Sequence, residues 1–223
     1  MDTLLRAESI SRRLHGDIPV TLVEDVSLEV HAGEFLAITG PSGSGKSSLL
    51  YLLGLLDQPS TGHIWLNSTE TTRCAEDRLA DLRLTHLGFV FQSHFLLPEF
   101  TASENVMLPM QLLGKLGQAQ IEARARDLLT DLGLHDQVCK LPKQMSGGQS
   151  QRVAIARALA NDPHIILADE PTGNLDTKSS GVVQDILRGL ARQQGRAVIA
   201  VTHDHAFAEK ADRIVTIVDG KIR

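Results

Sequence analysis

The sequence predicts an α/β fold built on a mostly parallel sheet. Two apolar runs without polar alternation, residues 164–168 and 197–202, are typical of buried strands. Segments with helical character precede them, at residues 147–159 and 178–193. Unbroken apolar strands that alternate with helices indicate parallel pairing, because crossover helices cover both faces of such a sheet.

The first third of the chain is expected to consist mainly of strands. Apolar and polar residues alternate over residues 26–31, which indicates a half-buried strand. A short apolar run at residues 34–39 precedes a leucine-rich helix at residues 46–56. Further strands are expected at residues 62–67 and 87–92.

Residues 93–144 have the character of a helical insertion. Charged residues lie on the other faces of a helix whose apolar positions are Ile121, Ala125, Leu128, Leu129 and Leu132. We therefore expect one domain over residues 1–223. Its core comprises residues 1–92 and 145–223, and residues 93–144 form an inserted helical subdomain.

Composition limits the classes of partner and location. Lys and Arg number 22 and Asp and Glu 27, so the net charge of −5 predicts no nucleic-acid partner. No apolar run reaches the roughly 20 residues that span a bilayer, so a role at a membrane would require another chain to cross it.

The N-terminus lacks a secretory-signal pattern. Cys74 and Cys139 lack metal-ligand spacing, which is typical of a reduced cytosolic protein.

A phosphate-binding loop lies between the strand at residues 34–39 and the helix after it. Residues 40–47 read GPSGSGKS and fit the pattern G-x-x-x-x-G-K-[ST]. Its glycines let backbone N–H groups turn toward phosphate oxygens, and the helix start favours an anion. Lys46 can reach the β- and γ-phosphates, and the Ser47 hydroxyl can ligate Mg²⁺. The expected nucleotide ligands are Gly40, Pro41, Ser42, Gly43, Ser44, Gly45, Lys46, Ser47 and Ser48. This motif alone does not separate a kinase, a GTPase and a transporter ATPase.

A second candidate site follows the apolar run at residues 164–168, where Asp169 and Glu170 stand in sequence. Carboxylates at the carboxyl end of a strand lie where α/β sheets bind ligands. Asp169 is placed to hold Mg²⁺, usually through water, and Glu170 to orient or deprotonate an attacking water. The alternative is a helix cap, since acids are common at strand ends.

Residues 146–149 read SGGQ and open an amphipathic helix. Ser146 is a good N-cap. Gly147 and Gly148 leave backbone N–H groups open at the helix start, which suits a second anion site. In isolation an ordinary capped helix is the simpler interpretation.

The order of these motifs resembles the ABC ATPase family along nearly the whole chain. The order comprises the phosphate loop, Gln92, residues 145–149, residues 169–170, residues 173–176 and residues 202–204. The SGGQ motif is highly specific to that family, and Met145 replaces its commoner leucine. The resemblance implies a P-loop NTPase (RecA-like) core with a mostly parallel sheet, an antiparallel N-terminal β subdomain and an inserted helical subdomain.

The resemblance also implies roles within one subunit. Lys46 and the loop amides hold the phosphates of ATP, and Ser47 and Gln92 approach Mg²⁺. Glu170 activates water, and His203 contacts the γ-phosphate and the reacting groups. The expected catalytic set is Glu170, His203, Gln92 and Lys46, and the expected metal set is Ser47, Gln92 and Asp169.

Other implied roles lie across a dimer. Ser146, Gly147 and Gly148 reach the γ-phosphate of ATP on the opposite subunit, and Gln149 belongs to the same nucleotide-binding set. Asp176 crosses the dimer seam. One chain then holds half of each site, so a head-to-tail dimer sandwiches two ATP molecules, and hydrolysis lets it open.

Residues 88–106 and 168–176 look like the branch that includes bacterial lipoprotein-release and macrolide-export ATPases. In that branch the membrane partner has few spans and a large extracytoplasmic domain. The chain is then expected at the cytoplasmic face of the inner membrane, as the ATPase that drives export or extraction of a lipid, lipoprotein or hydrophobic compound. Phe95, Leu96 and Leu97 belong either to the core or to a groove for the partner's coupling helix.

Three other functions are compatible with parts of this pattern. The first is mechanotransmission, in which the same complex activates an external hydrolase and transports nothing. The second is a soluble DNA-repair or ribosome-associated ABC protein, which usually has two fused halves or long insertions. The third is a small-molecule kinase, which would not need the SGGQ helix.

The chain departs from the family where adenine is expected to stack. Leu14 stands near the usual aromatic position with His15 beside it, and Tyr51 and Trp65 lie elsewhere. Aromatic stacking contributes about 0.5–1.5 kcal/mol beyond area burial. We therefore expect weak discrimination between bases.

Overall fold

The computed structural model describes residues 2–223 except residues 15, 17 and 18. The expectation for His15 lies outside this part of the chain. The described strands form two sheets, with orders β2-β1-β4-β5 and β10-β9-β3-β8-β7-β6. The chain thus has the expected α/β class with a separate N-terminal sheet.

The smaller sheet is antiparallel. Its strands are β1 (Thr3–Leu14), β2 (Val20–His31), β4 (Thr61–Leu66) and β5 (Thr69–Glu70). Burial alternates along β2, so one face of the sheet packs inward, as the alternation in the sequence predicts.

The larger sheet is parallel in its centre. Its strands are β3 (Phe35–Thr39), β6 (Leu87–Phe91), β7 (Ile165–Asp169), β8 (Ala197–Val201), β9 (Arg213–Val218) and β10 (Lys221–Ile222). The first five pair in parallel, and only β10 is antiparallel to its neighbour. Every residue of β8 is buried, which explains the unbroken apolar run in the sequence.

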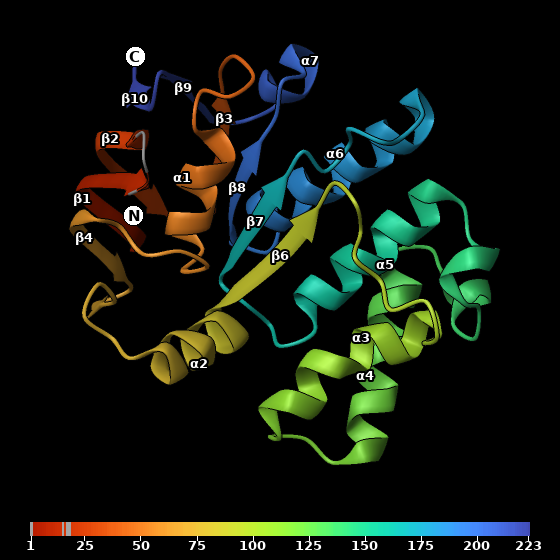
Figure 1. Ribbon diagram of the computed structural model, residues 1–223. Helices are drawn as coiled ribbons and strands as arrows, with labels where there is room; N and C mark the ends of the chain where they lie inside the picture. The colour runs from red at the N-terminus through yellow and green to blue at the C-terminus, as the bar shows by residue number, and fades with distance from the viewer. Residues whose placement is uncertain (1, 15, 17–18) are drawn as a thin grey trace.

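Helices cover both faces of the central sheet (Figure 1). They are α1 (Lys46–Leu53), α2 (Glu76–His86), α5 (Gly147–Leu159), α6 (Thr177–Arg192) and the short α7 (His205–Ala208). Leucines of α1 share one core with the antiparallel sheet and one face of the central sheet. Residues of α5, α6 and α7 share a second core with the other face.

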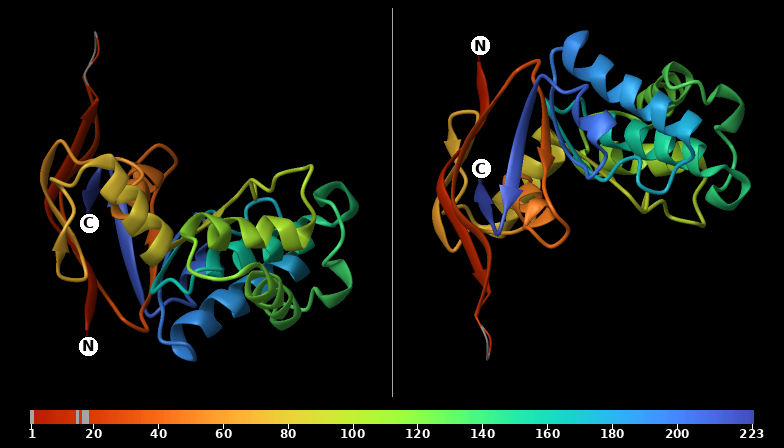
Figure 2. Two further views of the ribbon diagram at one scale, coloured as in Figure 1. Left: turned by 90° about the horizontal axis from the view of Figure 1, so that it is seen from below. Right: turned by 90° about the horizontal axis from the view of Figure 1, so that it is seen from above.

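The helical subdomain contains α3 (Ala102–Leu113), α4 (Gln118–Asp131), η1 (His135–Gln137) and η2 (Pro142–Gln144). Its apolar core also includes Val153 and Ala156 of α5. Figure 2 shows the antiparallel sheet at one end of the molecule and the green helices of this subdomain at the other. Helix α5 therefore links the subdomain to the central sheet.

Several elements differ from the sequence-based expectation, among them the following three. The leucine-rich helix ends at Leu53 rather than at residue 56, and Leu55 has a positive φ of 57°. Helix α2 was not predicted because only Leu79 and Leu82 of its 11 residues are buried. Strand β9 was not predicted because its alternation is short.

No helix within the described residues is both long enough and apolar enough to cross a membrane.

Candidate nucleotide site

The phosphate-binding loop joins β3 to α1 at the carboxyl edge of the central sheet. Gly40, Gly43 and Gly45 all have positive φ, at 143°, 76° and 99°. A Cβ atom at Gly40 would collide with the carbonyl oxygen of Ile217, and one at Gly45 with that of Leu22. Only glycine therefore fits at these two positions, and the loop backbone stays open to a ligand.

The remaining loop residues divide into exposed and buried groups. Pro41, Ser42 and Gly43 are exposed. Ser44 is buried, and its hydroxyl has no hydrogen-bond partner among the described residues. A buried polar group without a partner is unfavourable. A phosphate oxygen in the loop would supply the missing partner, so the loop fits the expected anion.

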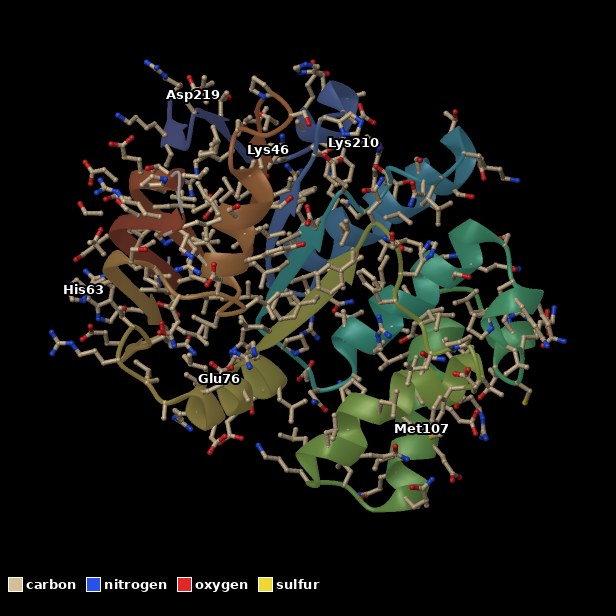
Figure 3. The ribbon with its side chains drawn as sticks, viewed as in Figure 1. Lys46, His63, Glu76, Met107, Lys210 and Asp219 are labelled. Atoms are coloured by element: carbon tan, nitrogen blue, oxygen red, sulfur yellow. The ribbon has the colours of Figure 1, made fainter. Side chains whose placement is uncertain are left out.

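Lys46 is folded back over the loop. The residue is 8% exposed, and its Nζ donates to the carbonyl oxygens of Gly40 at 2.9 Å and Pro41 at 2.8 Å. Figure 3 shows Lys46 at the start of α1. A buried ammonium favours an anionic partner. The positive charge of Lys46 lies beside the open N–H groups of the loop.

Asp169, the last residue of β7, is held by two hydroxyl groups of α1. Ser47 donates to its Oδ1 at 3.0 Å and Tyr51 donates to its Oδ2 at 3.1 Å. Burial raises the pKa of Tyr51, and the negative charge of Asp169 raises it further. The phenol therefore remains a proton donor to the carboxylate.

This arrangement fits a magnesium ion. Mg²⁺ prefers oxygen ligands and is commonly bound by one or two carboxylates together with substrate phosphates. Ser47 and Asp169 offer oxygens next to the phosphate loop. The described residues include no cluster of three or more His, Cys, Asp and Glu side chains suited to a metal, so phosphate or water oxygens would have to complete its coordination.

Glu170 and His203 form a pair beside this position. Glu170 follows β7 with a positive φ of 47°, and its N–H donates to the Val201 carbonyl at 3.0 Å. The His203 Nδ1 lies 2.9 Å from the Glu170 Oε1, where its N–H donates to the carboxylate. The backbone N–H of His203 donates to Oε2 at 3.4 Å. A carboxylate held in this way can accept a proton from water.

Gln92 follows β6 and is joined to the loop after Glu170. Its Nε2 donates to the Asn174 Oδ1 at 3.1 Å, and the Asn174 Nδ2 donates to the Gln92 carbonyl at 3.3 Å. Among the described residues, no hydrogen bond joins the Gln92 side chain to Ser47 or Asp169. Its approach to Mg²⁺ therefore stays a prediction.

The SGGQ motif forms the start of α5. The Ser146 Oγ accepts from the Gln149 N–H at 3.2 Å, and the Gln149 Oε1 accepts from the Ser146 N–H at 2.8 Å. This reciprocal capping box fixes the helix start. At Gly148 a Cβ would lie 2.5 Å from the Ser179 Oγ, so the glycine allows α5 to approach α6.

Asp176 caps α6. It accepts hydrogen bonds from the N–H of Ser179 at 2.9 Å and from the Ser179 hydroxyl at 2.8 Å. These bonds hold the pKa of Asp176 below its usual value, the backbone bond most strongly. The place of Asp176 at a dimer seam stays a prediction, and the structure adds this cap.

The predicted site residues thus divide between two faces of the sheet. The phosphate loop is continuous with α1, which packs on one face, whereas the SGGQ motif begins α5 on the other face (Figure 1). The hydrogen-bonded pair Glu170 and His203 follows the strands between them. One chain therefore presents two separated features that suit an anion, not one closed site.

Within the part of the chain that the structure describes, no aromatic ring is evident for a base. The Tyr51 hydroxyl is bonded to Asp169, and the Trp65 ring lies 4.1 Å from the Arg6 guanidinium carbon in a cation–π contact. Leu14, the residue nearest the expected position, is 44% exposed and pairs with Val20, which is 47% exposed. These two aliphatic side chains form an exposed apolar spot at the end of β1.

An apolar groove of about 380 Å³ lies away from these residues, among α2, β6, α3 and α5. Its lining includes Phe89, Phe91 and Arg157. Beside it, Phe95 is 64% exposed and packs edge-on against Phe91, with ring centroids 5.4 Å apart. Leu97 is 40% exposed, whereas Leu96 packs on the core of the helical subdomain.

Comparisons with known proteins follow the same pattern. A family model described as ABC transporter matches residues 23–173. The lipoprotein-releasing system ATP-binding protein LolD 1 of Chlorobium chlorochromatii is 48% identical over 99% of this chain and 91% of its own length. The corresponding LolD of Shewanella oneidensis is 45% identical over 100% of this chain and 96% of its own.

Two further similarities concern a longer protein and a solved structure. The macrolide export ATP-binding/permease protein MacB of Bartonella henselae is 48% identical over 99% of this chain, which spans 33% of that protein. The dimeric, post-hydrolysis structure of the ATP-binding cassette MJ0796 with ADP and Pi has a TM-score of 0.91 and 38% identity. That match covers 98% of this chain and 96% of the other.

Replacing Tyr51 by Phe tests its link to Asp169. The phenylalanine keeps the ring but removes the donor at 3.1 Å, so the carboxylate loses one of its two orienting bonds. We expect a several-fold higher Mg²⁺ concentration for half-maximal ATP hydrolysis, with nucleotide affinity in EDTA unchanged. A Mg²⁺ titration of the hydrolysis rate, beside a binding titration with a fluorescent nucleotide, measures both. An unchanged Mg²⁺ requirement would show that Ser47 alone orients Asp169.

Proposed function

We propose that this chain, which belongs to the ABC transporter family and is an ATP-hydrolysing cassette, drives a membrane partner. That partner would export or extract a lipid, lipoprotein or hydrophobic compound. The observation that carries the proposal is the division of the nucleotide site. The loop, Asp169, Glu170 and His203 lie near one another in one chain, while the SGGQ motif opens a helix on the far face of the sheet.

In the proposed reaction, Glu170 acts as the general base. Its carboxylate is oriented by the Nδ1–H of His203, so it can accept a proton from a water aligned with the γ-phosphate. Lys46 and the loop N–H groups bind the phosphates and stabilise the charge that develops on them. Ser47 and Asp169 would hold Mg²⁺, which when bound neutralises phosphate charge. The imidazole of His203 is largely exposed, and when both ring nitrogens carry a proton its Nε2–H can donate to the γ-phosphate.

The second half of each site comes from a second copy of the chain. Solved structures of the similar cassette MJ0796 are dimeric. We propose a head-to-tail dimer in which Ser146, Gly147, Gly148 and Gln149 approach ATP on the opposite subunit. The open N–H groups at the start of α5 suit the γ-phosphate. Hydrolysis cleaves the bond between the γ-phosphate and ADP, and release of the inorganic phosphate from the seam then lets the dimer open.

The apolar groove is the proposed contact with the membrane partner. The exposed Phe95 packs against Phe91 of the groove lining, and Leu97, two residues further along the chain, is also exposed. Exposed apolar residues that gather at one place mark interaction sites. A short cytoplasmic helix of the partner would fit there, next to β6, which Gln92 directly follows. This position would link partner movement to the nucleotide site through β6.

The names of the relatives support the class of cargo and the location. LolD is named as part of a lipoprotein-releasing system, and MacB as a macrolide export protein. We propose that this chain acts on the same chemical class of cargo, from the cytoplasmic face of the inner membrane. Its partner is then a membrane-spanning permease subunit with a large extracytoplasmic domain, and nucleic acid is not a partner.

The aliphatic spot of Leu14 and Val20 predicts weak base discrimination. A base lying there would gain apolar contact but not aromatic stacking, which contributes about 0.5–1.5 kcal/mol. We expect GTP to be hydrolysed at a rate within about tenfold of ATP, since 1.4 kcal/mol corresponds to a factor of ten. A direct competition between the two nucleotides measures the ratio of kcat/KM. A strong preference for ATP would contradict this prediction.

A pull-down from solubilised membranes tests the proposed partner. The bait is the Glu170→Gln chain with Mg-ATP, and the bound proteins are identified by mass spectrometry. We expect a membrane protein with few spans and a large external domain. The matched control is the same bait with Phe95→Asp, which places a charge at an exposed position beside the groove and should recover much less of the membrane protein.

Recovery of soluble partners only would contradict the transport function. A partner whose external domain is a hydrolase would favour mechanotransmission instead.

A further inference from the structure

One buried side chain joins three parts of the nucleotide site. Gln151 lies in α5 and is 0% exposed. Its Nε2 donates to the carbonyl oxygen of Pro171 at 2.7 Å and to that of Phe91 at 3.3 Å. Because both partners are carbonyl oxygens, only the NH₂ end of the amide can face them, which fixes its orientation.

The two carbonyl groups belong to residues adjacent to the site. Phe91 is the last residue of β6 and directly precedes Gln92, and Pro171 directly follows Glu170. One amide group therefore ties the helix of the SGGQ motif to the ends of two neighbouring strands. Those strands pair in parallel, with Phe91 opposite Asp169.

Glu170 needs such support because its backbone is unfavourable. Its φ of 47° lies in the left-handed region, which non-glycine residues rarely adopt. Such a conformation persists only where its surroundings hold it on more than one side. The N–H of Glu170 is bonded to Val201, and its carbonyl accepts from the N–H of Gly173 at 3.1 Å. Gln151 holds the next carbonyl along the chain.

A role in stability alone does not explain this glutamine. Its Oε1 is buried and has no hydrogen-bond partner among the described residues. A buried acceptor without a partner is destabilising, whereas an apolar residue of similar shape would avoid that penalty. Neighbouring positions of α5, such as Val153 and Ile155, are apolar and fully buried. The polar amide is therefore best explained by the two carbonyl groups that it holds.

We propose that Gln151 is a positioning residue that holds Glu170 and the backbone before Gln92 in register with the SGGQ helix. The proposal rests on the proposed role of Glu170 as the general base. Through this amide, a movement of α5 on dimer closure is transmitted to the water-activating carboxylate. Its effect should therefore appear in the rate of hydrolysis and not in nucleotide binding.

The test compares Gln151→Met with a structural control on the same helix. Methionine keeps the length of the side chain and removes the donor. Val153→Ala removes apolar contacts of α5 in the helical subdomain, away from Gln92 and Glu170. We expect Gln151→Met to lower kcat about 10- to 100-fold, the range that a misplaced catalytic group can produce. KM for ATP and the affinity for a fluorescent nucleotide should stay within about twofold. Val153→Ala should lower Tm, but its kcat should be unchanged when measured at temperatures well below that Tm.

Two outcomes would overturn the proposal. One is a Gln151→Met chain that hydrolyses ATP at the unaltered rate. The other is a chain that loses nucleotide binding and thermal stability together, as a merely structural residue would. Glu170→Gln is measured alongside: if that variant still hydrolyses ATP, the proposed function itself fails. If it is inactive while Gln151→Met is fully active, only the role of Gln151 fails.

Discussion

The parallel pairing of the central strands is the constraint on which the site depends. Because β6, β7 and β8 run in the same direction and in register, their carboxyl ends meet along one edge. Asp169 lies opposite Val201, so Glu170 and His203 come just past the two strand ends and can share a hydrogen bond. The glycine loop after β3 lies at that edge, where we propose that it binds phosphate. The strands contribute the chemical groups at their carboxyl ends, with Asp169 the last residue of β7 and Glu170 directly after it, and the sheet sets their spacing.

The second constraint is that one sheet cannot bring all the motifs together. The loop and α1 belong to one core, and the SGGQ helix belongs to cores on the other side. Closure of the site by a second copy follows from this division. Helix α5 also packs into the helical subdomain and lines the apolar groove, and its Gln151 contacts both strand ends. The same helix can therefore connect a partner in the groove, the opposite ATP and the catalytic carboxylate.

Sequence reasoning predicted the local motifs and missed the contacts that join them. The α/β class, the parallel strands and the family were confirmed, because unbroken apolar runs and a glycine-rich loop are local signals. Tyr51 was noted only as an aromatic residue, although it lies one helical turn after Ser47 and that spacing could have placed both hydroxyls on one face. Gln151 carried no local signal, since its partners lie 20 and 60 residues away. Helix α2 is mostly exposed and has weak periodicity.

The central claim is that ATP joins two copies of this chain, each supplying half of the site. The most direct measurement is the mass of the Glu170→Gln chain by light scattering, with and without saturating Mg-ATP. The account predicts a monomer without nucleotide and a stable dimer with ATP. This dimer should be lost when Ser146→Arg places a bulky charge at the start of α5. A Glu170→Gln chain that binds Mg-ATP and remains monomeric would contradict the account.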